Sequence, residues 1–195
     1  RIVLSSRVYL AYLGLGSLSY AGLFAWISGA SFVLQNLYGL TPFVFGCVFA
    51  VGSLGYLAGS TIAARLVSRF GLGGMSGIGA AALALGGLLA CLSIALGLTS
   101  SLSLVLPVAV FLAGLGMVLP QSIAGAITPF PERAGAASSL FGFVQQTAAA
   151  VCGALVAWLL GRNARPMVGA MALMGCATLL LWFASRGVRR AKTHG

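Results

Sequence analysis

The chain has 195 residues, of which 60% are hydrophobic and only 6% are charged, and its mean hydropathy is +1.08. A water-soluble domain has about a quarter of its residues charged, so this composition excludes a soluble protein and places the chain in a lipid bilayer. Its eleven Lys and Arg are accompanied by a single acidic residue, Glu132, which gives a net charge of +10.

In chain order, six stretches contain no Asp, Glu, Lys or Arg: residues 8–34, 43–64, 75–98, 102–127, 134–160 and 167–185. Each one meets or nearly meets the ~20 apolar residues that cross a ~30 Å hydrocarbon core as a helix. Alternating segments of ~10 residues, which mark a transmembrane barrel, do not occur. The sequence therefore predicts an all-α membrane protein, a single bundle of six transmembrane helices.

The connections between these stretches carry helix-start and helix-break signals. Thr41 and Pro42 are expected to begin the second helix, and Pro166 the sixth, because a proline in the first turn loses no hydrogen bond. Glycines at 71, 73 and 74 are expected to break the chain after the second helix. Within the fourth helix, Pro120 predicts a kink or local unwinding near Met117–Gln121.

The basic residues predict the orientation, because Lys and Arg near the ends of spans stay in the cytoplasm. With six spans, one side receives nine of them: Arg1, Arg7, Arg65, Arg69, Arg133, Arg186, Arg189, Arg190 and Lys192. The opposite side receives Arg162 and Arg165. Both termini, including a basic tail at residues 186–195, are therefore expected in the cytoplasm. The net charge is explained as a topology signal and requires no nucleic acid.

Several enzyme classes lack the residues that they need. The single histidine, His194, lies next to the carboxyl terminus, so no span offers a base for an intramembrane serine protease. No span contains the His and carboxylate ligands of a metal site or the titratable group of a proton pump. The four cysteines lie in four different stretches without metal-ligand spacing. We therefore expect no enzyme activity, no metal and no cofactor.

Neutral polar and aromatic groups at mid-span remain as candidates for ligand binding. Tyr20, Phe24 and Ser28 share one face of the first helix at four-residue spacing. Gln145 and Gln146 point about 100° apart, so at most one of them can face a cavity squarely. The candidate cavity residues are Tyr20, Phe24, Ser28, Met117, Gln121, Phe141 and Gln145. Ordinary interhelical hydrogen bonding is the alternative for each single residue.

Three segments resemble a known family. FAWISGASFVLQNLYGLTPFVFG (residues 24–46), GSTIAARLVSRFG (59–71) and PFPERAGAASSLFGFVQQ (129–146) are similar to segments of the Bcr/CflA drug-resistance transporters of the major facilitator superfamily. Departures from the family pattern occur at Ala30, Ser31, Ala64 and Gln121. They leave the fold untouched and the substrate preference open.

The resemblance implies the carboxyl-terminal six-helix half of a twelve-helix transporter, built from two three-helix inverted repeats. Such transporters are multi-pass proteins of the bacterial inner membrane that export lipophilic small molecules by alternating access, as proton-coupled multidrug antiporters. The first and fourth helices would line the cavity, the second and fifth would face the missing amino-terminal half, and the third and sixth would face lipid. Arg65, Arg69, Glu132 and Arg133 would form cytoplasmic loop motifs.

Two alternatives stay open. The chain could be a self-contained six-helix carrier or channel that acts as a homodimer, or a non-transporting membrane scaffold or gene remnant. Because it begins with Arg1 rather than Met, we expect a longer natural chain upstream, which would argue against the self-contained carrier. A cavity of aromatic rings and neutral amides suits many lipophilic compounds, so the sequence does not select one substrate.

Overall fold

The computed structural model describes residues 3–98, 101–161 and 163–190. Helices form nearly all of this part of the chain, and no strand occurs in it. The elements are α1 (Arg7–Ser31), η1 (Phe32–Leu37), α2 (Pro42–Ala95), α3 (Ser101–Ile127), η2 (Pro131–Arg133), α4 (Ala134–Leu159), α5 (Arg165–Ala184) and α6 (Arg186–Arg190). The all-α membrane fold expected from the sequence is confirmed.

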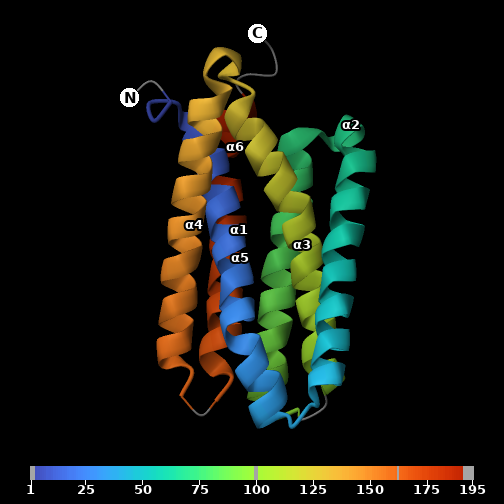
Figure 1. Cartoon of the computed structure of the whole chain (residues 1–195). Coiled ribbons are helices and arrows are strands. Elements are labelled where there is room, and N and C mark those ends of the chain that lie inside the picture. Colours follow the sequence, from blue (N-terminus) through green and yellow to red (C-terminus); the bar gives the residue numbers. More distant parts are fainter. Residues whose placement is uncertain (1–2, 99–100, 162, 191–195) are drawn as a thin grey trace.

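The element α2 contains two helices that meet at Gly71. This residue has φ 67° and ψ 171°, a left-handed conformation that favours glycine and reverses the chain direction. Figure 1 shows the turn at one end of the bundle, with one arm entering it and the other leaving. We call residues 42–70 the first arm and residues 72–95 the second arm.

Among the described residues, five helical segments are long and apolar enough to cross a membrane, and α2 accounts for one of them with 54 residues. Because the turn at Gly71 divides α2, these segments contain six helices, at about the positions of the six uncharged stretches. That all six cross the membrane stays a prediction. The first arm is longer than the expected stretch 43–64, and the second arm, at residues 72–95, begins and ends three residues before the expected stretch 75–98. The expected basic tail begins as the short helix α6, and residues 191–195 lie outside the described part.

Helix starts follow the local chemistry. Thr41 caps the first arm, since its hydroxyl oxygen accepts a hydrogen bond from the Val44 N–H (3.4 Å), and Pro42 follows in the first turn. Pro166 occupies the first turn of α5. Of the kink or local unwinding expected near Met117–Gln121, the unwinding does not occur, because α3 continues as a helix through Pro120; the kink stays a prediction. Flanking turns with intact hydrogen bonds tolerate the one that proline removes.

Glycines hold α3 between the two arms of α2. On the first arm, a Cβ at Gly55 would lie 2.6 Å from the Ala109 carbonyl oxygen, and a Cβ at Gly59 would overlap the Ala113 carbonyl. On the second arm, a Cβ at Gly79 would lie 2.7 Å from the Gly114 carbonyl oxygen. Lipid supplies no hydrophobic driving force between helices, so this close backbone approach is what stabilises the bundle.

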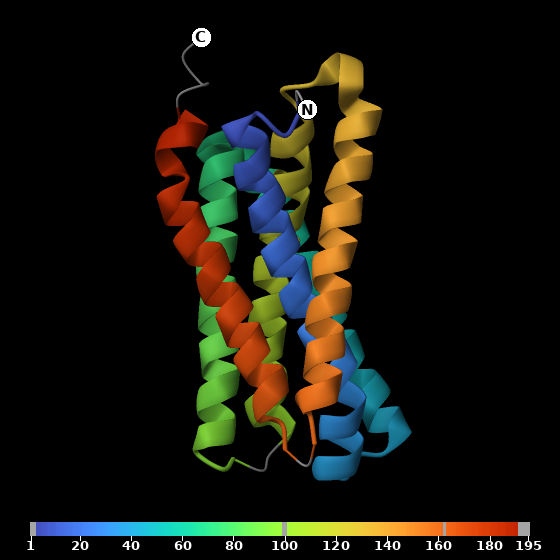
Figure 2. The ribbon, with the colours of Figure 1, turned by 90° about the vertical axis from the view of Figure 1, so that its left-hand side faces the viewer.

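The second arm also packs closely against α5. A Cβ at Gly87 would lie 2.7 Å from the Ala172 Cα, and a Cβ at Gly175 would lie 2.6 Å from the Leu83 carbonyl oxygen. Figure 2 shows α5 crossing the bundle diagonally, with α4 beside α1. The second arm and α5 therefore form one side of the molecule.

Most arginines gather at one end of the bundle. The start of α1, the turn at Gly71, the turn between α3 and α4, and α6 all lie there (Figure 1). We call it the basic end; its arginines in the described part of the chain are Arg7, Arg65, Arg69, Arg133, Arg186, Arg189 and Arg190. Arg165 begins α5 at the opposite end. Arg1, Arg162 and Lys192, which also entered the orientation count, lie outside the described residues.

Candidate ligand-binding surface

The candidate residues on α1 and α4 lie along one helix–helix contact. The two helices run parallel: the Tyr9 hydroxyl donates to the Ala137 carbonyl (2.8 Å), and the Phe141 ring fills the space beside Gly16. Further along, a Cβ at Gly153 would lie 2.7 Å from the Ser28 hydroxyl oxygen. This register aligns residues 16, 20, 24 and 28 of α1 with residues 141, 145, 149 and 153 of α4.

Tyr20 and Phe24 form the aromatic part of this contact. Their ring centroids lie 5.2 Å apart with an interplanar angle of 46°, and both side chains are half-buried. A tilted pair at this separation is favourable. Both rings stay partly accessible, so a planar apolar ligand could contact them. The Ser28 hydroxyl, in contrast, points toward the backbone of α4 near Gly153.

Gln145 lies between α1 and α4, at the depth of Tyr20. Its side chain is only 8% exposed, makes no hydrogen bond among the described residues, and keeps its amide partly accessible. A buried amide without a partner is costly, so it favours a ligand or water that completes its hydrogen bonds. Gln146, one residue later, is exposed on a different face of α4.

Gln121 and Met117 lie on a different part of the interior. Gln121 is 7% exposed and has no hydrogen-bond partner among the described residues. Its neighbour Ser122 is fully buried beside Gly16, and its hydroxyl also lacks a partner there. The Met117 Cβ would lie 2.7 Å from a Cβ at Gly79, so Met117 packs toward the second arm.

The seven candidates therefore form two groups. Tyr20, Phe24, Ser28, Phe141 and Gln145 share the contact between α1 and α4, and Phe141 at 2% exposure packs inside it rather than offering a free ring. Gln121 and Met117 face the interior on α3. None of the seven lines any of four grooves found on the bundle. Tyr20, Phe24 and Ser28 are half-buried at the surface of the bundle, whereas Phe141, Gln145 and Gln121 are buried in contacts between helices.

This surface continues on α1 and faces away from α5. Gly22 and Gly29 contact Met174 and Met167 of α5, whereas Tyr20 and Ile27, two residues earlier in each case, point about 160° away. Ile27 and Ser31 are exposed on this side. The Ser31 hydroxyl oxygen accepts a hydrogen bond from the Gln35 amide (2.9 Å).

On α4 the surface continues as a strip of narrow side chains. It consists of Ser139, Gly142, Gln146, Ala150 and Ala157, all at least partly exposed. Thr147 and Val151, on another side of α4, line a groove toward α5. The strip thus lies on the side away from α5, as Tyr20 and Ile27 do. Sequence reasoning missed it, although the spacing of three and four residues would have indicated one face.

The first arm carries a similar strip of small side chains, interrupted by the exposed Leu57: Gly46, Ala50, Ser53, Thr61, Ala64 and Ser68, all exposed. Phe49, one turn before Ser53, packs against Trp26 of α1 with ring centroids 5.9 Å apart. The strip of the first arm therefore lies on the side of α1. We call the two strips, together with Tyr20, Phe24, Ile27 and Ser31 of α1, the open face.

The loop residues singled out in the sequence all lie at the basic end. Arg65 and Arg69 are exposed on the last turns of the first arm, and Glu132 and Arg133 are exposed in η2. None of these four side chains makes an ion pair or a hydrogen bond among the described residues.

The chain was compared with known proteins. No family model matches it. It is 29% identical over 180 residues to the uncharacterized MFS-type transporter YdgK of Bacillus subtilis, covering 88% of this chain and 42% of that protein. It is 29% identical over 174 residues to a bicyclomycin resistance protein homolog of Haemophilus influenzae, covering 89% and 44%. Multidrug resistance protein D of Escherichia coli is 35% identical over 86 residues, 44% of this chain and 22% of that protein.

These matches confirm the resemblance on which the sequence analysis rests. The chain spans less than half the length of each of these relatives.

Proposed function

Because the chain is homologous to transporters of the major facilitator superfamily, we propose that it is the carboxyl-terminal half of a small-molecule efflux transporter that works by alternating access and is coupled to protons. The observation that carries this proposal is the open face. It presents the half-buried rings of Tyr20 and Phe24 beside the buried amide of Gln145, and no described part of the chain closes over these rings. A second half of similar size, as the length of the relatives suggests, would complete the cavity.

The composition of the open face supports this partner. Two helices can approach closely in lipid where their side chains are small. The strips on the first arm and α4 flank Tyr20 and Phe24 on either side, so helices of the missing half could pack against the strips while leaving a space over α1. Lipophilic molecules would stack on the rings and form hydrogen bonds with the amide of Gln145.

The absence of acidic and histidine side chains from the expected spans fits a transporter in which the other half carries the proton-coupling group. Glu132, which lies in a loop, is the only carboxylate of the chain, and His194 its only histidine. Proton coupling therefore requires an acidic group in the missing half. In this proposal the present half contributes binding and movement, and the other half contributes the proton site.

Transport by the separate and combined halves tests the proposal. Vesicles that contain this chain alone should show no dye accumulation driven by a pH gradient. Vesicles that contain the complete transporter should accumulate dye, and deletion of residues 1–195 from it should abolish the uptake. Uphill transport by the chain alone would instead favour the self-contained homodimer.

We also propose that the basic end lies in the cytoplasm of a bacterial cell, with the protein in the inner membrane, because arginines at span ends resist translocation. In a cysteine-free background, cysteines at Asn36 and Asn163, both exposed at the opposite end, should react with an impermeant thiol reagent in intact cells. A cysteine at Ser68, exposed at the basic end, should react only after lysis. Labelling of position 68 in intact cells would contradict this orientation.

A further inference from the structure

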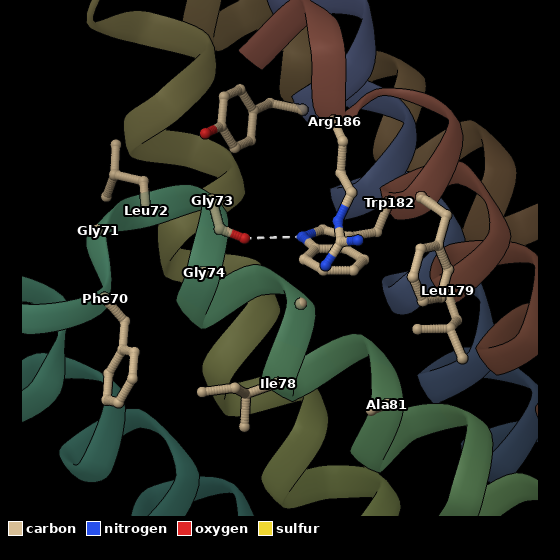
Figure 3. Close-up of a pocket in the computed structure, with 13 residues that line it drawn as sticks. Phe70, Gly71, Leu72, Gly73, Gly74, Ile78, Ala81, Leu179, Trp182 and Arg186 are labelled. Atoms are coloured by element: carbon tan, nitrogen blue, oxygen red, sulfur yellow. Dashed lines mark hydrogen bonds between the residues drawn. The ribbon is translucent and has the colours of Figure 1, made fainter. Parts of the chain in front are cut away.

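A second feature lies on the other side of the molecule, between the second arm and α5. It is a groove of about 790 Å³ at the basic end. The Gly71 turn forms one edge, and Trp182 and Arg186 form the opposite edge (Figure 3). Because α5 and the second arm form its walls, the groove faces away from the open face.

The walls of the groove are apolar and extend into the membrane. Ile78, Ala81, Leu179 and Phe183 line it. From Gly71 to Ala81 the second arm rises about 15 Å, which is about half of a ~30 Å hydrocarbon core. The lower part of the groove therefore lies at the depth of lipid acyl chains, and its mouth lies at the depth of the headgroups.

A positive charge is held at the mouth. The Arg186 guanidinium carbon lies 3.9 Å from the centre of the Trp182 ring and 4.8 Å from that of Phe183. The Trp182 indole N–H in turn donates to the Gly73 carbonyl (2.7 Å; Figure 3). The second arm thus fixes the indole, and the indole orients the guanidinium through a cation–π contact.

This guanidinium has no anionic partner in the described part of the chain. Arg186 makes no ion pair there, and Glu132, the only acidic residue, makes none either. Arg69, which is exposed and directly precedes the groove residue Phe70, carries a second positive charge at the same turn of the chain. An apolar groove with a cationic mouth at headgroup depth has the chemical character that complements an anionic amphiphile.

We propose that this groove binds an anionic phospholipid, with its phosphate at Arg186 and one acyl chain along Ile78, Ala81 and Leu179. Guanidinium groups suit phosphate because they can donate two parallel hydrogen bonds. Basic pockets between transmembrane helices on the cytoplasmic side are places where acidic headgroups bind. The site goes beyond the proposed transport function, because it uses neither the open face nor the missing half.

Quenching of Trp182 by brominated lipid tests this site. Trp26→Phe and Trp158→Phe leave Trp182 as the only tryptophan. The complete transporter carrying this background, with tryptophans of its other half also replaced, is placed in phosphatidylcholine vesicles. One set of vesicles contains brominated phosphatidylglycerol, and a second set contains the same fraction of brominated phosphatidylcholine. We expect several-fold stronger apparent association of the anionic lipid. Arg186→Gln should lower that preference about fivefold, which corresponds to ~1 kcal/mol for one basic residue.

Matched variants separate the parts of the site. Arg186→Lys keeps the charge and should keep most of the preference. Arg165→Gln, at the opposite end, should leave it unchanged. Ala81→Phe should obstruct the acyl groove and lower quenching by the anionic lipid. Leu88→Phe, exposed on the same arm outside the groove, should not.

Three results would overturn the proposal. The first is equal quenching by the two lipids in the parent protein. The second is an equal loss of preference in Arg186→Gln and Arg165→Gln, which would indicate general surface charge. The third is displacement of the lipid by millimolar inorganic phosphate, which would indicate a site for free anions. None of these results depends on drug transport, so failure here leaves the transport proposal standing.

Discussion

The exposed surfaces of the second arm and α5 differ from those of the first arm and α4. The second arm exposes Ile78, Leu85, Leu88, Leu89 and Leu92, and α5 exposes Leu173 and Leu180. The first arm and α4 also expose large side chains, such as Leu54 and Phe143. In addition, the first arm and α4 carry the strips of small side chains that belong to the open face, and the second arm and α5 do not contribute to that face.

This difference separates contact with lipid from contact with protein. Leucine side chains are as apolar as lipid tails and need no specific partner, so a leucine surface suits the bilayer. Narrow side chains bury little apolar area in lipid, but they allow another helix to approach closely. Small residues allow this close approach inside the bundle as well, because Gly55 and Gly59 contact the backbone of α3. The strips therefore suit contacts with helices that are not part of this chain.

The largest expected effect comes from disrupting the contact between the first arm and α3. Gly59→Leu would drive a side chain into the Ala113 backbone, and neither helix can yield locally. Overpacking costs ~1–3 kcal/mol or more, so we expect loss of folded protein on fluorescence-detected size-exclusion chromatography. Gly46→Leu on the same arm, where a Cβ would meet nothing within 4 Å, should fold normally. Equal folding of both variants would mean that the first arm does not depend on close packing.

The next effect tests the two kinds of surface directly. A Cβ at Gly142 of α4 or at Gly169 of α5 would meet nothing within 4 Å, so Gly142→Leu and Gly169→Leu should both fold. In the complete transporter, Gly142→Leu should strongly reduce drug resistance at normal membrane levels, because it fills the narrow strip. Gly169→Leu should change resistance little, because α5 faces lipid. If resistance is unchanged in both variants, the strip of α4 contacts no partner.

The sequence predicted the helices well because their signals are local. Charge-free stretches set the spans, Thr41 and Pro42 start the first arm, and the glycine-rich segment after Arg69 turns the chain at Gly71 as expected. Each feature depends on a few neighbouring residues. The contacts of Gly55 and Gly59 with α3 also have a local cause, since glycine lets two helix backbones approach closely.

The candidate surface was harder to predict because it depends on how helices rotate against one another. Gln145 and Gln146 are equivalent in the sequence, yet one lies against α1 and the other is exposed. Phe141 looked like a cavity residue but fills the space beside Gly16. The bond from Trp182 to Gly73 joins residues 109 positions apart, and no local pattern indicates it. Such contacts follow from tertiary packing alone.

A smaller effect sharpens the role of the open face by using that pair of glutamines. In the complete transporter, Gln145→Ala removes an amide beside Tyr20 and should weaken resistance to some drugs, with about a five- to tenfold loss of affinity for one hydrogen bond. Tyr20→Phe, which keeps the ring and loses the hydroxyl, should have a similar or smaller effect. Dose–response curves and surface expression measure both.

Gln146→Ala provides the comparison on α4. If the strip only packs against the missing half, this variant should leave the order of drug preferences unchanged and alter the protein's stability instead. A reordered drug profile in Gln146→Ala, together with an unchanged one in Gln145→Ala, would exchange the two assignments. Lower expression of Gln145→Ala with an unaltered profile would identify Gln145 as a structural contact between α1 and α4.

The smallest expected effect concerns a hydrogen bond at the end of the bundle opposite the basic end. The Tyr38 hydroxyl donates to the Leu98 carbonyl (3.1 Å), which joins the segment before the first arm to the segment after the second arm. The bond is exposed to solvent, so Tyr38→Phe should cost no more than ~1 kcal/mol in thermal unfolding and leave transport intact.

Burial raises the pKa of Tyr38 above its ordinary value. The favourable contribution of the protonated hydroxyl is therefore fully present below pH ~10, the unfolded value, and is lost as the pH rises through the folded pKa. The stability difference between parent and variant should stay constant from about pH 6 to 9 and shrink only in more alkaline solution. Loss of transport in Tyr38→Phe would show instead that the first arm must be held in register with the second for the open face to work.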